Sequence, residues 1–225
     1  MTGAAPPPER RDHAEPRDHA ERLVFFTDAV VAIALTLLVL PLVDLVPEAR
    51  RSGLGLGELV HENLAEVGSF LLSFVVIFRF WWAHHQLFRH VSRLSRTVVA
   101  WNLLWMVSIV FMPVPTAIIT AYSPSPGTVL LYVGTLVVSS GSLTALAVTV
   151  HRNPALSVGR SRETSDEVLG SGASLVALVL ALVLGSLFSD SVNYFALLLL
   201  LLTGVVERVV RTRWARSRGD ERAGT

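Results

Sequence analysis

The first long apolar run of this chain, which begins at Leu23, contains a carboxylate at Asp28. A carboxylate in the hydrocarbon of a bilayer costs about 3 kcal/mol or more, so it faces protein or water and by default marks a functional site. Arg22, Phe26 and Thr27 lie beside it and supply a guanidinium, an aromatic ring and a hydroxyl. The chemistry open to this group is proton transfer, cation binding or a buried hydrogen-bond network.

Two later apolar runs carry polar groups that are able to pair with this carboxylate. The second run ends with Trp81, His84 and His85, and the third begins near Asn102. Adjacent histidines point about 100° apart on a helix, so only one of the pair faces a given partner. An amide such as that of Asn102 bridges helices by hydrogen bonding. We predict a hydrogen-bonded cluster near the cytoplasmic end of the first helix, made of Arg22, Thr27, Asp28, Trp81, His84 and Asn102.

The residues needed for catalysis or metal binding do not come together in the sequence. The absence of cysteine excludes disulfides, iron–sulfur clusters and thiolate metal sites. The histidines lie in tails, loops and the ends of apolar runs, which argues against a haem held between paired mid-span histidines. Ser139, Ser140 and Ser142 have no His or Asp near them in sequence, and they fit close helix packing better than nucleophilic catalysis. We therefore expect no enzyme activity, no metal site, no cofactor and no nucleic-acid partner.

Composition places the chain in a membrane. Hydrophobic residues make up 52% of the chain, and its mean hydropathy is +0.54. Because the apolar residues are grouped into long runs, we predict an all-α integral membrane protein with six transmembrane helices. The predicted spans are Leu23–Val43, Leu64–Trp82, Val98–Thr120, Val129–Val150, Val168–Phe188 and Val192–Val206. Pro113 and Pro115 are expected to kink or end the third span.

Arginine placement predicts the orientation. The arginines are concentrated after the second, fourth and sixth spans, for example Arg89, Arg93, Arg96 and Arg152. By contrast, the loop 121–128 carries no charge, and the loop 44–62 has more acidic than basic residues. Positive residues favour the cytoplasmic side, so both termini and the even-numbered loops are expected there. Every basic side chain is Arg and none is Lys, a bias that we attribute to a bacterial genome.

The chain divides into three parts. Residues 1–21 are rich in Pro and in charges of both signs, lack the apolar core of a signal peptide and are expected to form a disordered cytoplasmic tail. A short repeat there contains His13 and His19, which we interpret as solvated side chains rather than metal ligands. Residues 22–210 form the six-helix domain. Residues 211–225 form an Arg-rich cytoplasmic tail, which we expect to lie against anionic headgroups.

The motif Arg22-x-x-x-Phe26-Thr27-Asp28 resembles the first-helix signature of the transmembrane protein 175 family, which comprises potassium channels of eukaryotic lysosomes and of prokaryotes. The family usually has Ser where this chain has Thr27, and both supply a hydroxyl. Further elements of the signature follow in order over roughly residues 22–120: Trp81-x-x-His84-His85, Asn102 and Pro113-x-Pro115.

This resemblance implies a homotetramer in which the first helix of each subunit lines a central pore. The chain has no Thr-Val-Gly-Tyr-Gly filter loop. In the family, bulky apolar side chains of the first helix form the constriction. The corresponding positions here are Ile33, Leu37 and Leu40, with Thr36 beside them.

Helical geometry is compatible with that assignment. At about 100° per residue, Leu37 and Leu40 lie about 40° and 20° to either side of Ile33, and Thr36 lies about 60° away. Asp28 lies about 140° from Ile33, toward the bundle. The same helix is thus able to direct Ile and Leu side chains at a pore and Asp28 at neighbouring helices. Asp28 is therefore a better candidate for a structural network than for an ion ligand.

The function expected from this resemblance is that of a potassium-permeable cation channel in the bacterial plasma membrane, with itself and the bilayer as partners. A dry ring of Ile33, Leu37 and Leu40 blocks ions, and a slight widening admits a partly hydrated potassium ion. Stripping water costs less for potassium than for sodium, and the Thr36 hydroxyl offsets part of that cost. The alternative is a proton-coupled secondary transporter in which Asp28 and His84 titrate.

Overall fold

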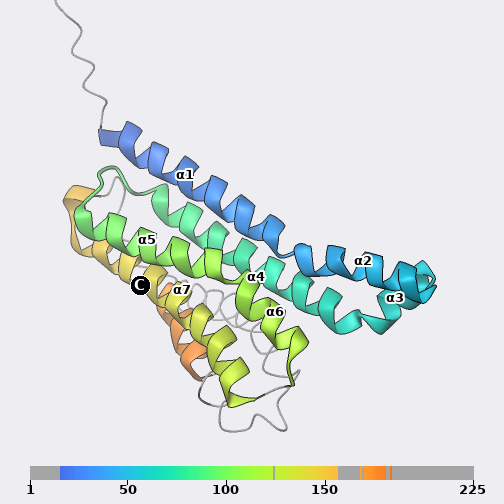
Figure 1. The fold of residues 1–225 in the computed structure, drawn as a ribbon. Helices are drawn as coiled ribbons and strands as arrows, with labels where there is room; N and C mark the ends of the chain where they lie inside the picture. Colours follow the sequence, from blue (N-terminus) through green and yellow to red (C-terminus); the bar gives the residue numbers. More distant parts are fainter. Residues whose placement is uncertain (1–15, 124, 157–167, 169, 181–182, 184–225) are drawn as a thin grey trace, which may run out of the picture.

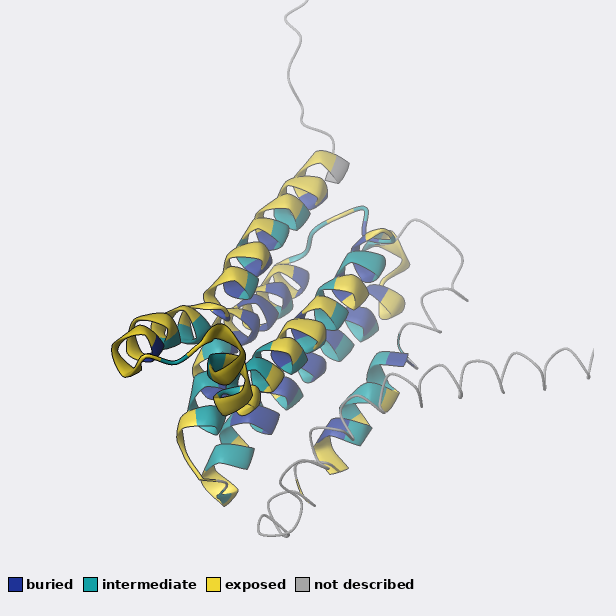
Figure 2. Ribbon diagram, turned by 90° about the vertical axis from the view of Figure 1, so that its right-hand side faces the viewer, coloured by how far each residue is buried: buried dark blue, intermediate teal, exposed yellow. Residues whose placement is uncertain are grey.

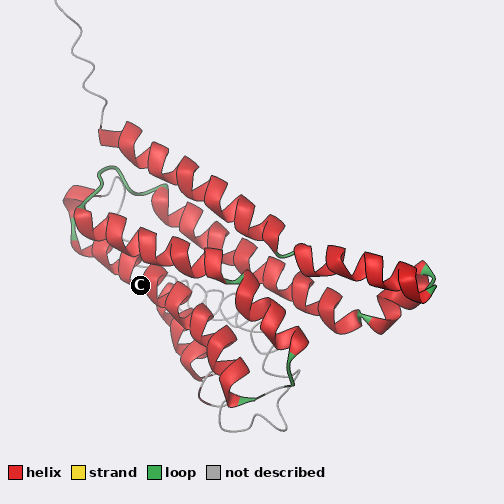
Figure 3. Ribbon diagram, viewed as in Figure 1, coloured by secondary structure: helices red, strands yellow, loops and turns green. Residues whose placement is uncertain are grey.

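The computed structural model describes residues 16–123, 125–156, 168, 170–180 and 183 of the 225-residue chain. Every regular element in these ranges is a helix (Figure 3). The all-α class predicted from the sequence is therefore confirmed for the described residues. The predicted sixth span, Val192–Val206, and the Arg-rich tail 211–225 lie outside them.

The helices follow one another with short connections (Figure 1). They are α1 (Pro16–Leu37), α2 (Leu40–Ser52), α3 (Leu56–Glu62), α4 (Leu64–Phe88), α5 (Arg96–Phe111), α6 (Pro113–Ala121) and α7 (Pro126–Arg152). A single 3-10 turn, η1 (Pro154–Leu156), follows α7. A further apolar helix covers Gly170–Leu180.

Within the described ranges, four helical stretches are long and apolar enough to cross a membrane. They are Asp18–Ser52, Leu64–Phe88, Arg96–Ala121 and Pro126–Arg152. These stretches contain the first four predicted spans, and the helix Gly170–Leu180 falls within the predicted fifth. The chain is a multi-pass membrane protein, and its sixth helix stays a prediction from the sequence.

The first predicted span is not one continuous helix, so that detail of the prediction was wrong. Helix α1 ends at Leu37, and α2 begins at Leu40 after a turn at residues 38–39. Pro41 stands in the first turn of α2 and has no N–H to give to the carbonyl four residues earlier. The Val39 N–H instead reaches the Thr36 carbonyl at 3.3 Å, which tightens the last turn of α1.

The third span is interrupted at its prolines, as we predicted. Helix α5 ends at Phe111 and α6 starts at Pro113, with Met112 between them. The Met112 N–H bonds to the Ile109 carbonyl at 3.1 Å, a bond between residues three apart in place of the usual four. The third span therefore consists of two helical segments.

Two segments that we predicted to be irregular are helical. Residues 16–21 belong to α1, which begins with a proline, a residue favoured in the first turn of a helix. Residues 44–62 are not a simple loop, because they complete α2 and form α3. Gly53 separates these two helices with φ +72°, a left-handed conformation that suits glycine. The charges of this segment hid its helical character in the sequence.

Helix α5 lies against both α7 and α1, and α4 contacts α1, α6 and α7. The buried core contains Trp105 and Ile109 from α5 and Leu136 and Leu146 from α7. In Figure 2 the buried parts of the ribbon lie where helices run beside one another, whereas α2 and α3 are mostly exposed. Membrane helices associate mainly through such packing and through interhelical hydrogen bonds.

The start of α1, the α4–α5 loop and the end of α7 lie at the same end of the bundle, on the left in Figure 1. The α4–α5 loop is tied there to η1. Ser92 donates to the Leu156 carbonyl through its main-chain N–H at 2.8 Å and its hydroxyl at 3.2 Å. The two arginine-containing loops that we predicted to be cytoplasmic are therefore joined directly.

Candidate functional site on the first helix

The carboxylate of Asp28 accepts a hydrogen bond from a tryptophan of the neighbouring helix α4. The distance from Trp81 Nε1 to Asp28 Oδ1 is 2.7 Å, and both side chains are half-buried. Hydrogen bonds to a charged acceptor are short and about twice as strong as neutral ones. This contact attaches α1 to α4 and gives the intramembrane carboxylate a protein partner.

A second set of hydrogen bonds connects α4, α5 and α1 beside this contact. His84 Nε2 lies 2.6 Å from Asn102 Oδ1, and Asn102 Nδ2 donates to Thr27 Oγ1 at 3.2 Å. Thr27 in turn donates to the Leu23 carbonyl at 2.8 Å. All three of these side chains are buried. Because Asn102 Oδ1 carries no hydrogen, His84 must donate through Nε2, which fixes the direction of the whole chain of bonds.

The His84 ring is held by aromatic neighbours. It stacks on Trp105 with ring centroids 4.3 Å apart and an interplanar angle of 12°, and it lies 4.4 Å from Phe88. Trp105 was not among the predicted members of the cluster, although it stands one helical turn after Asn102 and so shares its helix face. Aromatic packing therefore supplements the hydrogen bonds in holding this histidine.

The structure brings together five of the six residues predicted for the cluster, but not Arg22. The Arg22 side chain is exposed, and no hydrogen bond links it to the described members of the cluster. Phe26 of the same motif is also exposed. Both side chains lie on faces of α1 that the other described helices leave exposed.

The stripe predicted to line a pore lies on the open side of the subunit. Ile33, Leu37 and Leu40 expose 60%, 39% and 51% of their surface, and Thr36 is also exposed. By contrast, Leu38 and Ala34, which point into the subunit, expose 3% and 1%. Leu40 belongs to α2, so the stripe crosses the break and is not one row on a continuous helix.

Two further polar contacts in the bundle were not predicted from the sequence. The Ser73 hydroxyl of α4 lies 3.2 Å from the Tyr132 hydroxyl of α7 and 2.9 Å from the Thr116 hydroxyl of α6. The Ser108 and Ser139 hydroxyls join α5 to α7 across 2.7 Å. Small hydroxyl residues inside apolar runs were the available signal for such contacts.

Helix α4 also carries a charge within its membrane-length stretch. Arg79 Nη2 donates to Ser174 Oγ of the helix Gly170–Leu180 at 3.2 Å. Intramembrane arginines face the protein interior or water. This contact connects α4 to the part of the predicted fifth span that the structure describes.

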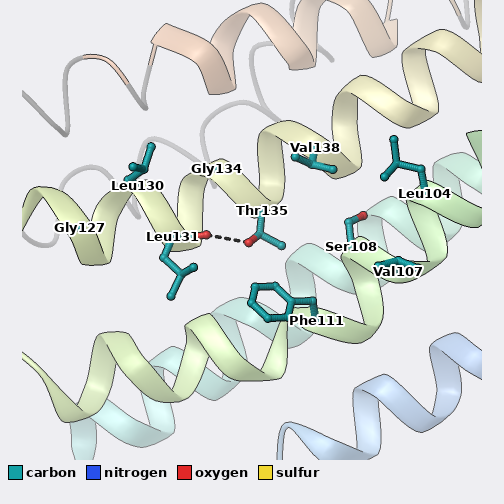
Figure 4. A pocket seen from close by; sticks show the side chains of 10 residues that line it. All are labelled: Leu104, Val107, Ser108, Phe111, Gly127, Leu130, Leu131, Gly134, Thr135 and Val138. Atoms are coloured by element: carbon teal, nitrogen blue, oxygen red, sulfur yellow. Dashed lines mark hydrogen bonds between the residues drawn. The ribbon is translucent and has the colours of Figure 1, made fainter.

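An apolar groove of about 440 Å³ lies between α5 and α7 (Figure 4). Leu104, Val107 and Phe111 line one side, and Leu130 and Val138 line the other. Its two hydroxyl residues are already bonded within the subunit: Thr135 to the Leu131 carbonyl at 2.7 Å, and Ser108 to the Trp105 carbonyl at 2.6 Å. The hydroxyl hydrogens of the described lining are therefore already used within the subunit, and the rest of this lining is apolar.

Metal binding finds no support in the part of the chain that the structure describes. No group of three or more His, Asp or Glu side chains is close enough there to hold a metal ion. His84 and Asp28, the titrating groups of the transporter alternative, are each engaged by a partner, Asn102 and Trp81. The geometry of the site is that of a helix-joining network beside an exposed apolar stripe.

The first half of the chain is similar to a known family and to curated proteins. Residues 22–113 match the family model described as "Endosomal/lysosomal potassium channel TMEM175". A potassium channel of Streptomyces collinus is 37% identical over 101 residues, which are 45% of this chain and 48% of that protein. A potassium channel of Chamaesiphon minutus is 35% identical over 106 residues, which are 47% of this chain and 51% of that protein.

A human protein named "Endosomal/lysosomal proton channel TMEM175" is 28% identical over 224 residues, covering 94% of this chain and 43% of the human protein. The chain spans about half the length of the curated relatives it matches. These relatives are named as ion channels and not as enzymes.

The fold is shared with a solved structure. The crystal structure of a lysosomal potassium-selective channel TMEM175 homolog from Chamaesiphon minutus superposes with a TM-score of 0.68 at 22% identity. The match covers 84% of this chain and 98% of that chain. The matched range, residues 22–113, contains the signature Arg22-x-x-x-Phe26-Thr27-Asp28, so this segment of the chain is similar to the TMEM175 family.

Proposed function

We propose that this protein is a potassium-permeable cation channel formed by four parallel copies of the chain around a central axis. One subunit has one helix of the pore type, and one helix does not enclose a pathway. Cyclic symmetry is the common solution for such homo-oligomers, and it brings equivalent faces of α1 to one axis. Two bacterial relatives are named potassium channels, which supports potassium as the permeant ion.

One observation carries this proposal: α1 is held on one face and open on the other. Thr27 and Asp28 attach one face to α4 and α5. Ile33 and Leu37 are exposed on the opposite side, inside a stretch long and apolar enough to span a membrane. Exposed apolar side chains in such a stretch contact either lipid or another subunit. When copies of the chain are arranged around an axis, these side chains face the central pathway.

In this proposal the side chains of Ile33, Leu37 and Leu40 form both filter and gate. A narrow ring of these side chains excludes water and stops ions. A small rotation or outward shift of α1 widens the ring, and a partly hydrated ion passes. The exposed Thr36 hydroxyl lies beside the ring and replaces part of the lost hydration. Potassium is favoured over sodium because it gives up water more readily.

The polar cluster serves as an anchor in this mechanism. Hydrogen bonds from Trp81 and Asn102 hold α1 against its own subunit. Movement of α4 and α5 is then transmitted to the helix that carries the stripe. No described residue of the cluster faces the open side of α1, so we assign these residues a structural role and not ion binding.

Planar-bilayer recording in asymmetric potassium and sodium tests the channel. The wild-type protein is expected to give currents that reverse near the potassium equilibrium potential. Leu37→Ser and Ile33→Ser should raise conductance and reduce discrimination between the two cations. Leu56→Ser replaces an exposed leucine of α3 outside the stripe and serves as the control. If the assembled Leu37→Ser and Ile33→Ser proteins give unchanged currents, the stripe does not line the pathway.

The same recordings separate the channel from the proton-coupled transporter. A transporter moves its substrate only with its coupled ion, so a proton gradient sets the direction of its flux. A channel current instead reverses with the potassium gradient when the pH is equal on both sides. Flux that requires a proton gradient, and that disappears in Asp28→Asn or His84→Gln, would favour the transporter.

We further propose the bacterial plasma membrane as the location, with residues 1–21 and 211–225 in the cytoplasm and 22–210 as the six-helix domain. The direct contact between Ser92 and Leu156 supports a common side for the two arginine-containing loops. Single cysteines are informative because the chain has none of its own. A membrane-impermeant maleimide added to intact cells should label Tyr122→Cys and not Arg93→Cys, and the reverse pattern would invert the topology.

A further inference from the structure

One side of helix α4 is exposed along most of its length. Four apolar side chains on this side expose between 48% and 54% of their surface: Leu71, Val75, Phe78 and Trp82. Their spacing of four, three and four residues places them within about 60° of arc on a helix. Arg89, which is exposed, follows on the same line two turns after Trp82. We call these five residues the outer face of α4.

The described neighbours of α4 leave its outer face open. Ile77 and His84 lie on the opposite side of the helix and are buried in the bundle. On one flank Trp81 donates to the carboxylate on α1, and on the other flank Arg79 donates to the helix Gly170–Leu180. The outer face lies between these two contacts. Within the described part of the chain, it therefore points away from the subunit.

The order of side chains along this face follows the depth profile of a phospholipid. From Leu71 to Trp82 the helix rises about 16 Å, which is close to one leaflet of a hydrocarbon core about 30 Å thick. Tryptophan is enriched at the boundary between hydrocarbon and headgroups. Arg89 lies about 10 Å further along, and an arginine side chain is long enough to approach that boundary. The face thus presents apolar surface, an interfacial ring and a charge, as a lipid presents chain, ester and phosphate.

The charge of Arg89 is not neutralised by any described residue. Its Nη1 donates to the neutral amide oxygen of Gln86 at 2.9 Å. A guanidinium has five N–H donors, so further donors are left for a phosphate. Arg93 and Arg96 are exposed in the α4–α5 loop and the first turn of α5, and Arg152 is exposed at the same end of the bundle (Figure 1). Clusters of arginine beside membrane helices attract anionic headgroups.

We propose that the outer face of α4 binds an anionic phospholipid. An acyl chain lies along Leu71, Val75 and Phe78. The ester region lies at Trp82, and the phosphate accepts hydrogen bonds from Arg89. An apolar face alone suits a neutral lipid or a second copy of the chain equally well, and the charge at its end selects an anionic lipid.

A bound lipid has a consequence for the first helix. The outer face belongs to the same helix as Trp81, whose indole holds the carboxylate of Asp28. A lipid that fixes α4 therefore also fixes the position of α1. The lipid site itself does not depend on the proposed channel function, because binding is measurable without ion flux. In the proposed topology the lipid belongs to the inner leaflet.

Lipid binding by the purified full-length protein is the direct test. Native mass spectrometry compares the affinity for phosphatidylglycerol with that for phosphatidylcholine of the same chain length. The wild-type protein should bind phosphatidylglycerol more tightly. Arg89→Gln should reduce this advantage about fivefold, which corresponds to about 1 kcal/mol. Arg51→Gln is the matched control, since Arg51 is an exposed arginine of α2 outside the outer face, and it should leave the advantage unchanged.

Fluorescence quenching places the lipid on this helix and does not require an arginine variant to assemble. Bromine on an acyl chain quenches only tryptophans that the chain contacts. The chain has five tryptophans, so the difference in quenching between the wild type and Trp82→Phe isolates Trp82. Brominated phosphatidylglycerol should quench Trp82 more strongly than brominated phosphatidylcholine does, and added salt should reduce that difference.

The outcomes separate the lipid from other occupants. Preference for phosphatidylglycerol that depends on Arg89 and not on Arg51, together with quenching of Trp82, supports the site. Equal affinity for the two lipids, or equal losses in Arg89→Gln and Arg51→Gln, would overturn the preference for an anionic lipid. A Trp82 that neither brominated lipid quenches would show that another subunit covers the outer face, and the lipid site would be wrong. A protein that binds the lipid in this way but carries no current would defeat the channel and leave the lipid site standing.

Discussion

Trp81 on α4 donates its indole hydrogen to the carboxylate of Asp28 on α1 across 2.7 Å. The partner of this intramembrane carboxylate is thus a neutral donor. A guanidinium from Arg22 was the expected alternative, but that side chain is exposed at the end of α1. The carboxylate therefore depends on a single aromatic residue of the neighbouring helix for its described contact.

Trp81→Phe should destabilise the subunit by about 2 kcal/mol, because it keeps the ring and removes the only donor described for Asp28. Thermal unfolding in detergent, followed by size-exclusion chromatography, measures the loss. Trp82→Phe is the control, since Trp82 is adjacent and largely exposed. Equal destabilisation by the two changes would show that the Asp28 contact contributes little.

Asp28→Ala should damage assembly or stability more than it changes permeability ratios. The physical reason is that its oxygen joins α1 to α4 and lies away from the exposed stripe. Size-exclusion chromatography gives the oligomer content, and reversal potentials give the ratios. A stable Asp28→Ala oligomer that has lost its potassium preference would instead make Asp28 a direct ion site.

Thr27 tests the chain of hydrogen bonds through Asn102. Thr27→Ser keeps the hydroxyl that Asn102 Nδ2 donates to and should change the unfolding temperature little. Thr27→Val has nearly the same volume but leaves the buried amide without its acceptor, at a cost of about 1–3 kcal/mol. Thr36→Val, at an exposed position on the same helix, provides the control for replacing a hydroxyl by a methyl group. A Thr27→Val protein as stable as Thr27→Ser would contradict the network.

Cysteine crosslinking tests the arrangement of subunits. Leu40 is exposed, so Leu40→Cys copies should meet near the axis and give covalent dimers under oxidation. Leu38 is buried within its own subunit, and Leu38→Cys should not crosslink. The chain has no other cysteine to confuse the result. Equal crosslinking at both positions, or a protein that conducts as a monomer, would defeat the four-subunit pore.

The Ser73 hydroxyl cluster offers a graded test of buried polar packing. Tyr132→Phe removes one contact and leaves Ser73 beside Thr116, so the expected loss of stability is about 1 kcal/mol. Ser73→Ala removes the central group, which deprives the buried Tyr132 hydroxyl of its described partner and should cost more. Thermal unfolding of the two variants and their double mutant measures the coupling. Additive losses would show that the hydroxyls do not act together.

The sequence was sufficient for features that depend on local composition. Long apolar runs predicted the membrane stretches, because crossing a bilayer requires about 20 apolar residues whatever the neighbours are. A buried carboxylate or amide requires hydrogen bonds, and this requirement predicted contacts between the first helix and the side chains of Trp81, His84 and Asn102. Pro113 and Pro115 predicted an interrupted third span for the same kind of local reason, since proline lacks an N–H.

Other features were decided only by the tertiary structure. Arg22 is near Asp28 in sequence, yet the direction of α1 leaves it outside the cluster, while Trp105 enters by stacking on His84. The contact of Ser73 with Tyr132 joins residues distant in the chain, and no periodicity within either helix reveals it. The exposed side of Ile33 and Leu37 is defined by which helices cover α1, since an apolar stripe packs equally well against a core, lipid or a second subunit. The sequence thus determined which segments enter the membrane and which of their polar groups require hydrogen-bond partners. The packing of α4, α5 and α7 determined which of these groups find a partner within one subunit, and which apolar side chains stay exposed.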